Sequence, residues 1–189
     1  MILSDKSIKE RIKKGDIIVD PLNMDDIQPA SIDLHLGNKF VIFKNYLTDI
    51  YDVKKNIDNT ETVDIGGDGF FIVHPNEFIL ASTVESFKIP DDIVGRLEGR
   101  SSIGRTGLIV HMTAGFIDPG FKGNITLEMM NFSAIPIKIY PNMRICQIAF
   151  EELTTKADVP YGAKAVRNKY SGQSDPVPSR IWKEFREDK

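Results

Sequence analysis

Short apolar segments that recur at close spacing, each bounded by turn-forming residues, constrain the fold of this chain most strongly. Residues 125–132, 135–140 and 145–150 are three such segments, separated by Ser133-Ala134 and by Pro141-Asn142. We interpret each of them as a short strand. Strands and turns at this spacing predict a mostly β fold, either a sandwich, a jelly roll or a distorted barrel.

Segments nearer the N-terminus follow the same pattern. Residues 70–73 and 78–83 flank a turn at His74-Pro75-Asn76, which indicates two further strands. Residues 32–36 alternate between apolar and polar side chains, as in a strand with one buried face. The polar segment 49–68 is expected to be a long excursion between strands.

The two ends of the chain differ from this body. A short helix is expected first, because Ser4 can cap its start and Gly15 follows its basic last turn. After Leu153 the apolar periodicity fades, and residues 154–189 carry eight Lys or Arg against five Asp or Glu. We expect this segment to be a flexible closing tail that meets a small polyanion. A solvated tail without a role is the alternative.

Composition limits the function classes. An apolar fraction of 41% and a charged fraction of 27% over 189 residues predict one globular domain, residues 1–189, without a membrane span. The N-terminus has no apolar region typical of a secretory signal. A single cysteine, Cys146, fits a reducing compartment, so we expect a cytoplasmic protein. The net charge of −3 argues against nucleic acid as a partner.

One glycine- and arginine-rich stretch, Gly99-Arg100-Ser101-Ser102-Ile103-Gly104-Arg105-Thr106, nearly matches the P-loop pattern. A P-loop requires a helix after it, but residues 107–110 resemble a strand, so we reject that motif. The stretch still suits phosphate, since it combines two hydroxyls, two guanidiniums and glycine backbone N–H groups. A turn with solvated arginines is the alternative.

Two carboxylates lie in the segment that follows. Asp118 precedes Pro-Gly, where an aspartate commonly caps its own turn. Strand alternation places Thr126, Glu128 and Met130 on one face, opposite Ile125, Leu127 and Met129. A half-buried Glu128 would suit general acid–base chemistry. A salt bridge, or an edge-strand glutamate facing water, is the structural alternative.

A zinc site is not expected. The zinc deaminases combine a His or Cys, a glutamate and a Pro-Cys-x-x-Cys pair. This chain has one cysteine and three isolated histidines, His35, His74 and His111. We interpret His111, between Val110 and Met112, as a satisfied strand residue and not as a ligand.

Several blocks in the same order resemble the deoxycytidine triphosphate (dCTP) deaminases of the deoxyuridine triphosphatase superfamily. GRSSIGR and HMTAGFIDPGFKGNITLE carry the resemblance, which MILSDKSI, QPASIDLHLG, HPNEFILASTVE and KYSGQSDPVPSR extend over nearly the whole chain. It implies a distorted jelly roll or β-barrel of the β-clip type, with a short N-terminal helix and a C-terminal arm. It also implies a homotrimer with nucleotide sites at subunit boundaries.

The resemblance further implies roles for individual residues. Glu128 falls on the catalytic glutamate and Asp118 on the aspartate that contacts the sugar. The residues that bind the triphosphate in the family match Arg100, Ser101, Ser102, Ile103, Gly104 and Arg105. Further nucleotide contacts match Thr126, Leu127 and Gln147. The tail residues that close over the phosphates match Tyr161, Lys169 and Gln173. Mg²⁺ would arrive through the triphosphate, without named protein ligands. The ligands would be dCTP and dUTP, with dTTP open as a feedback inhibitor.

The family divides by product. Some members release dUTP, whereas others also cleave it to dUMP and diphosphate for thymidylate supply. Gly115 and Phe116, before Ile117-Asp118, resemble the second group, so we expect dUMP, with Asp118 near the hydrolytic water. A deaminase that stops at dUTP and a non-catalytic nucleotide sensor are the alternatives. Glu128 argues against the sensor.

Overall fold

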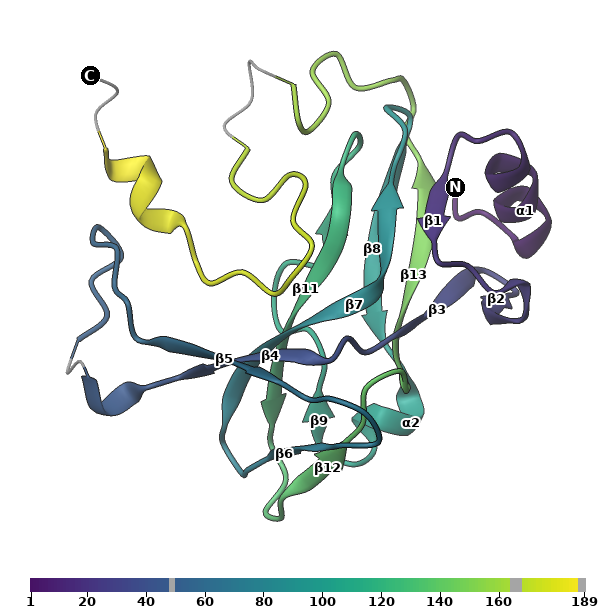
Figure 1. Ribbon diagram of the computed structural model, residues 1–189. Helices are drawn as coiled ribbons and strands as arrows, with labels where there is room; N and C mark the ends of the chain where they lie inside the picture. The colour runs from purple at the N-terminus through teal and green to yellow at the C-terminus, as the bar shows by residue number, and fades with distance from the viewer. Residues whose placement is uncertain (48–49, 164–167, 187–189) are drawn as a thin grey trace.

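The structure is a computed structural model that describes residues 1–47, 50–163 and 168–186. Two larger antiparallel sheets pack against each other, with a two-stranded sheet at one end (Figure 1). The first sheet has the order β5-β4-β7-β11-β9, with β1 added to β7, and the second has the order β10-β8-β13-β3-β2. Among the described residues neither large sheet closes on itself, so the expected jelly roll describes the fold and a closed barrel does not.

The strands are short and come from the whole chain. The first sheet contains β1 (Ile18–Asp20), β4 (Lys39–Phe43), β5 (Thr60–Asp64), β7 (Phe78–Lys88), β9 (Leu108–Ile109) and β11 (Lys122–Asn131). The second contains β2 (Ile27–Gln28), β3 (Ser31–His35), β8 (Ile93–Gly99), β10 (Phe116–Ile117) and β13 (Arg144–Glu152). The third pairs β6 (Phe71–Val73) with β12 (Ile137–Ile139).

Helical segments are few in the described part of the chain. The helix α1 spans Asp5–Lys13, and the four-residue α2 spans Ser101–Gly104. Three 3₁₀ turns are η1 (Met24–Asp26), η2 (Asn45–Leu47) and η3 (Ile181–Phe185). The expected helix start is confirmed, since the Ser4 side chain accepts a hydrogen bond from the Ser7 N–H, and Gly15 follows with φ of +76°.

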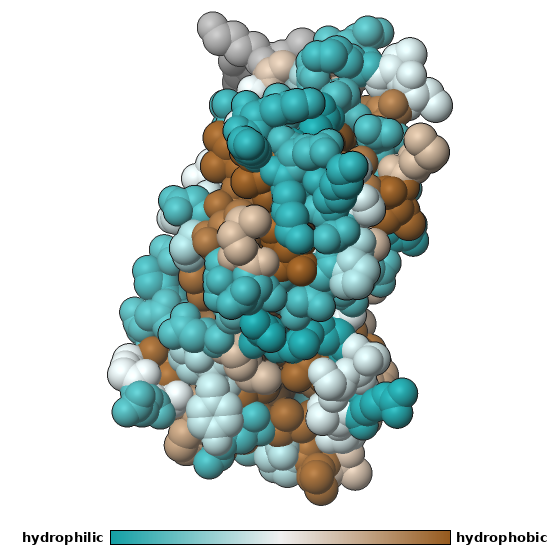
Figure 2. Space-filling model, turned by 90° about the vertical axis from the view of Figure 1, so that its right-hand side faces the viewer, coloured by the Kyte–Doolittle hydropathy of each residue, from teal (hydrophilic) through white to brown (hydrophobic). Residues whose placement is uncertain are grey.

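The core lies between the two large sheets. Alternate residues of each strand contribute to it, such as Leu127 and Met129 from β11 and Ile148 and Phe150 from β13, all with 0% exposure. The side of the molecule that carries α1 is mainly hydrophilic, with apolar side chains showing in small groups (Figure 2). No helix within the described residues is long and apolar enough to span a membrane.

Two expectations about strands are wrong. Asp33 was expected on the exposed face of its strand but is only 4% exposed, because its carboxylate pairs with Arg100 and Arg144. The segment 49–68 is not only an excursion, since it contains β5, which pairs with β4 along its full length. The tail begins after β13, and its residues 164–167 and 187–189 lie outside the described residues.

The glycine- and arginine-rich stretch, residues 99–106, is followed by the expected strand but also contains a short helix. A strand, β8, precedes it, and the short helix α2 begins inside it at Ser101. The expected strand follows as β9. The helical turn is therefore four residues long and leads back into a strand, which differs from the long helix that a P-loop requires.

Candidate active site

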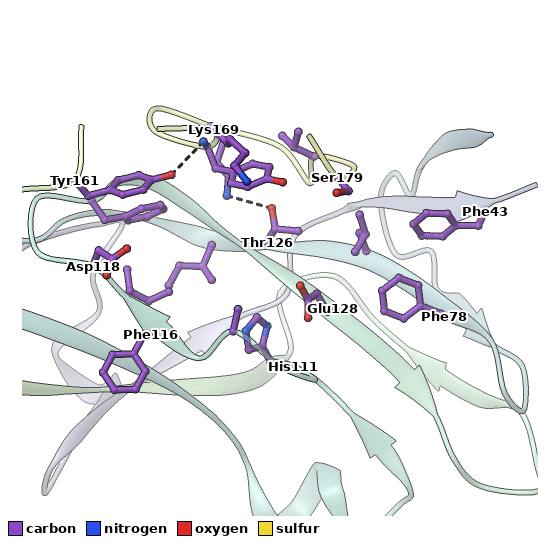
Figure 3. Close-up of a pocket in the computed structure, with 18 of the residues that line it drawn as sticks. Phe43, Phe78, His111, Phe116, Asp118, Thr126, Glu128, Tyr161, Lys169 and Ser179 are labelled. Atoms are coloured by element: carbon purple, nitrogen blue, oxygen red, sulfur yellow. Dashed lines mark hydrogen bonds between the residues drawn. The ribbon is translucent and has the colours of Figure 1, made fainter. Parts of the chain in front are cut away.

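A cavity of about 540 Å³ lies between one face of the first sheet and the C-terminal tail. Alternation along β11 places Thr126 and Glu128 on this face, and the neighbouring strand β7 adds Phe78 and Leu80. Tyr161 and Lys169 from the tail cover the cavity from the other side (Figure 3). Gln173 of the tail also lines it. Asp118, after β10, closes one end. The structure thus brings together six of the residues expected to bind or act on the nucleotide: Asp118, Thr126, Glu128, Tyr161, Lys169 and Gln173.

Glu128 is held by a residue that the sequence did not single out. The hydroxyl of Thr113 donates a hydrogen bond of 2.9 Å to Oε2 of Glu128. The Glu128 side chain is half-buried and faces the cavity. One carboxylate oxygen is therefore fixed in place, while Oε1 can contact a molecule in the cavity.

The tail is held down mostly by backbone hydrogen bonds. Gln173 forms a parallel bridge with Gly123, in which the Asn124 N–H donates to the Gln173 carbonyl at 2.9 Å. The Tyr161 N–H likewise donates to the Pro119 carbonyl at 2.7 Å. The Gln173 amide donates to Oγ1 of Thr126 at 3.1 Å, and its Oε1 is buried without a partner in the described part of the chain. That oxygen can accept a hydrogen bond from a ligand.

Gly123 makes the close approach of the tail possible. Its φ is +122°, and a Cβ there would lie 2.5 Å from the Gln173 carbonyl oxygen. A side chain at position 123 would therefore collide with the tail backbone and would also strain the strand.

The outer edge of β11 is open beside Glu128. Gln173 pairs with this edge at Gly123, and β9 pairs with it from Met130 onward. No strand covers the edge between them in the described residues. The Leu127 side chain is fully buried on the core side, so only its backbone can contact a nucleotide. Backbone N–H and C=O groups of this edge are available to pair with a base.

The expected phosphate-binding run lies elsewhere. Arg100, Ser101, Ser102, Ile103, Gly104 and Arg105 occupy α2 and its two ends, and none of them lines the main cavity. Arg100 and Gly104 line a separate cavity of about 390 Å³ with Gly107. Gln147 is also distant from Glu128, because it lies on β13 of the second sheet, where its amide donates to the Gly99 carbonyl. One chain therefore holds two separate groups of expected site residues.

Gly115 and Phe116 lie beside the main cavity. Phe116 lines it, whereas Gly115 lines a smaller adjoining cavity of about 250 Å³. A Cβ on Gly115 would lie 3.1 Å from the Leu97 carbonyl oxygen on β8. The missing side chain thus permits close contact between this segment and β8.

His111 was expected to be a satisfied strand residue, and this is wrong. It lies after β9, and within the described residues both of its ring nitrogens are buried without a hydrogen-bond partner. It lines all three cavities. The signal that could have found His111 and Thr113 is their position at the start of HMTAGFIDPGFKGNITLE, one of the stretches that carry the resemblance.

No three His, Cys, Asp or Glu side chains of the described residues converge on a point that could hold a metal ion. Cys146 is fully buried, and burial raises the pKa of its thiol far above its usual range. The donor set of the main cavity, carboxylates with hydroxyl and amide groups, offers no ready-made cage for Mg²⁺. Residues 48–49, 164–167 and 187–189 lie outside this description.

The chain belongs to the dCTP deaminase-like family, whose model matches residues 2–153. Similar proteins named "dCTP deaminase, dUMP-forming" occur in Methanobrevibacter smithii, with 47% identity over 184 residues, and in Streptomyces griseus, with 46% identity over 186 residues. The first alignment covers 95% of this chain and 95% of the relative, and the second covers 98% and 97%. The resemblance inferred from sequence is therefore confirmed.

A solved structure supports the fold. The crystal structure of 2'-deoxycytidine 5'-triphosphate deaminase from Agrobacterium tumefaciens has a TM-score of 0.62 and 23% identity to this chain. The match covers 80% of this chain and 48% of that longer chain. At this identity the likeness shows the fold, which agrees with the predicted mostly β jelly roll.

Proposed function

We propose that this protein deaminates dCTP with water and also cleaves the triphosphate, releasing ammonia, dUMP and diphosphate. The observation that carries the proposal is the placement of Glu128, which faces a cavity shared with Asp118 and is covered by the tail. The name of the relatives, together with identity of 45–47% over nearly the full chain, supports the same reaction.

Glu128 would act as the general base and then as the general acid. Water adds its oxygen to C4 of cytosine while Glu128 accepts a proton, and the same proton passes to the amino group as the C4–N bond breaks. The remaining proton of the water moves from the C4 oxygen to N3, which gives uracil. Such positioned proton transfer contributes roughly 10²–10⁴-fold to a rate. The Thr113 hydrogen bond would keep the carboxylate oriented during both transfers.

A second water would attack the α-phosphorus, and diphosphate would leave. Asp118 is proposed to contact the sugar and to orient or deprotonate this water. Mg²⁺ is proposed to bind through the phosphate oxygens, since such ions commonly use few protein ligands beside substrate phosphates. The bound ion would neutralise phosphate charge, and the steps assigned to Glu128 and Asp118 do not depend on its position.

The complete site is proposed to form in a homotrimer. The phosphate-binding run and Glu128 line different cavities of one chain, so the run of a neighbouring copy would complete the site. Exposed apolar side chains support such an interface, since Ile109, Met112, Phe116 and Phe132 are 37–64% exposed around the two smaller cavities. Residues 154–189 would close over the phosphates as a lid of a single domain.

One incubation tests the proposal. The protein is mixed with dCTP and Mg²⁺, ammonia is measured, and nucleotides are separated by anion exchange. The expected result is ammonia with equimolar dUMP and diphosphate. Stoichiometric dUTP would favour the deaminase without phosphate cleavage, and binding without ammonia would favour the nucleotide sensor. Addition of dTTP to the same assay tests feedback inhibition in the proposed cytoplasmic role.

A further inference from the structure

Arg144 lies beside the expected phosphate-binding run, although no role has been assigned to it. It begins β13, next to α2 (Figure 1). Nη1 of Arg100 donates a hydrogen bond to the Arg144 carbonyl at 3.4 Å. The two guanidiniums also flank one carboxylate, since Nε of Arg100 is 3.3 Å from Oδ1 of Asp33 and Nε of Arg144 is 4.0 Å from Oδ2. Gln147, another residue expected to contact the nucleotide, lies directly opposite Asp33 in the sheet.

A β-bulge explains why Arg144 points to this side of the sheet. Between Arg144 and Cys146 the pairing of β13 with β3 shifts by one residue, which makes Ile145 an extra residue in β13. In a regular strand Arg144 and Cys146 would share a face, and Cys146 is fully buried in the core. The bulge directs the Arg144 side chain away from the core, where it is exposed. Bulges commonly re-aim a side chain in this way next to functional sites.

Buried carboxylates orient both guanidiniums. Asp26 in η1 is 4% exposed, and its Oδ1 lies 2.7 Å from Nη2 of Arg144. Asp33, which pairs with Arg100, is also 4% exposed. The side chains of Arg100 and Arg144 themselves remain 30% and 41% exposed. Because a guanidinium has more N–H donors than these contacts use, each arginine keeps donors that can reach an anion.

The charges around Arg144 decide which ligand fits it. The two carboxylates cancel the charges of the two guanidiniums, so this group attracts an anion only weakly by net charge. His35 also approaches Asp26, with 4.0 Å between Nε2 and Oδ1, but it pairs more closely with Glu85 at 2.6 Å. What remains at Arg144 is a planar fork of N–H groups, which matches two oxygens of one phosphate group. A phosphate in direct contact is therefore the ligand that fits.

We propose that Arg144 is a further phosphate-binding residue that acts with Arg100 on the triphosphate of the substrate. The inference rests on the proposed function, in which the triphosphate lies at residues 100–105. Arg100 contacts the phosphate chain from the end of β8, and Arg144 donates from the start of β13 to oxygens that Arg100 does not reach. Asp26 holds the Arg144 guanidinium during binding. Both arginines belong to one copy of the chain, so they serve the same site of the homotrimer.

The test measures the KM for dCTP and, by calorimetry, the Kd of inorganic triphosphate and of deoxycytidine, with Mg²⁺ and the purified full chain. The variant is Arg144→Lys, which keeps a charge beside Asp26 but loses the fork. We expect values about tenfold higher for dCTP and inorganic triphosphate, because hydrogen bonds to a charged group are lost. The Kd of deoxycytidine, which has no phosphate, should change by no more than about twofold. Unchanged values for dCTP and inorganic triphosphate, or an equal loss for deoxycytidine, overturn the inference.

Arg11→Lys is the matched control. Arg11 is also held by two carboxylates, with Nη1 3.1 Å from Asp16 and Nη2 2.7 Å from Asp92. It belongs to α1, outside both groups of expected site residues, so its replacement should leave all three constants unchanged. Thermal melting and gel filtration check that each variant keeps its fold and assembly.

A double variant, Asp26→Asn with Arg144→Gln, separates phosphate binding from a purely structural role. It removes the guanidinium and its buried carboxylate together, so no unpaired charge is left at that position. We expect it to bind inorganic triphosphate as weakly as Arg144→Lys does. Normal binding by the double variant would mean that Arg144 only neutralises Asp26, which contradicts the inference. Binding of inorganic triphosphate that depends on Arg144, without ammonia release from dCTP, would keep the inference and reject the proposed function.

Discussion

Oδ1 of Asp33 lies 3.3 Å from Nε of Arg100. This ion pair links the strand β3 to Arg100, the first residue of the expected phosphate-binding run. Asp33 is 4% exposed, and its other oxygen is 4.0 Å from Nε of Arg144. The guanidinium of Arg100 also donates to the Arg144 carbonyl. Arg100 is therefore oriented before any phosphate arrives.

Asp33→Asn should raise the KM for dCTP about tenfold, with a smaller change in kcat, because a hydrogen bond between charged groups is lost. The effect should increase with the number of phosphates on the ligand. Asp5→Asn is the control, since Asp5 is an exposed residue whose ion pair with Lys9 is also exposed. An equal effect on deoxycytidine and dCTP binding would show that Asp33 does not act through the phosphates.

Glu128→Gln should abolish ammonia release and leave nucleotide binding largely intact. The amide keeps the shape of the side chain but cannot accept a proton from water, and the expected loss in kcat is about 10²–10⁴-fold or more. Steady-state kinetics and calorimetric titration with dCTP measure the two effects. Turnover within a few-fold of the unmodified protein would remove Glu128 from the mechanism.

Thr113→Val should lower kcat by about tenfold, since the loss of one hydrogen bond to a charged group leaves Glu128 less well oriented. Thr113→Ser is the matched control and should restore most of the rate, because it keeps the hydroxyl. The pH profile of kcat provides the second readout and should shift in the valine variant only. Identical profiles for both variants would indicate a purely structural role for Thr113.

Gly123→Ala should release the tail, because the new methyl group would meet the Gln173 backbone. We expect faster proteolysis of the tail and a higher KM for dCTP. Gly172→Ala is the control for backbone strain, since Gly172 has φ of +78° and no atom within 4 Å of the added methyl. Equal protease sensitivity of the two variants would mean that strain, and not the collision, explains the result.

Local features were predictable from sequence. Alternation along residues 125–132 correctly separated Thr126 and Glu128 from the buried Leu127, because side-chain direction in a strand depends only on the local backbone. The helix boundaries followed from Ser4 and Gly15 for the same reason. The resemblance then supplied the functional residues, and six of them meet in one cavity.

Long-range features were not predictable. The three consecutive segments 125–132, 135–140 and 145–150 lie in three different sheets, since strand partners come from distant parts of the chain. Asp33 is buried only because Arg100 and Arg144 approach it in the fold. Arg105 likewise lies at the end of α2 and does not line the cavity that Glu128 faces, which no local pattern indicated.

The backbone pairing of the tail has a consequence for how this protein can vary over evolution. Because Tyr161 and Gln173 dock through main-chain groups on Pro119 and Asn124, the number of residues between them sets where Gln173 lands. A substitution in this stretch leaves that spacing intact, whereas an inserted or deleted residue moves the amide away from Thr126. Natural variants are therefore expected to agree in the length of this stretch and to keep Lys169, which lines the cavity.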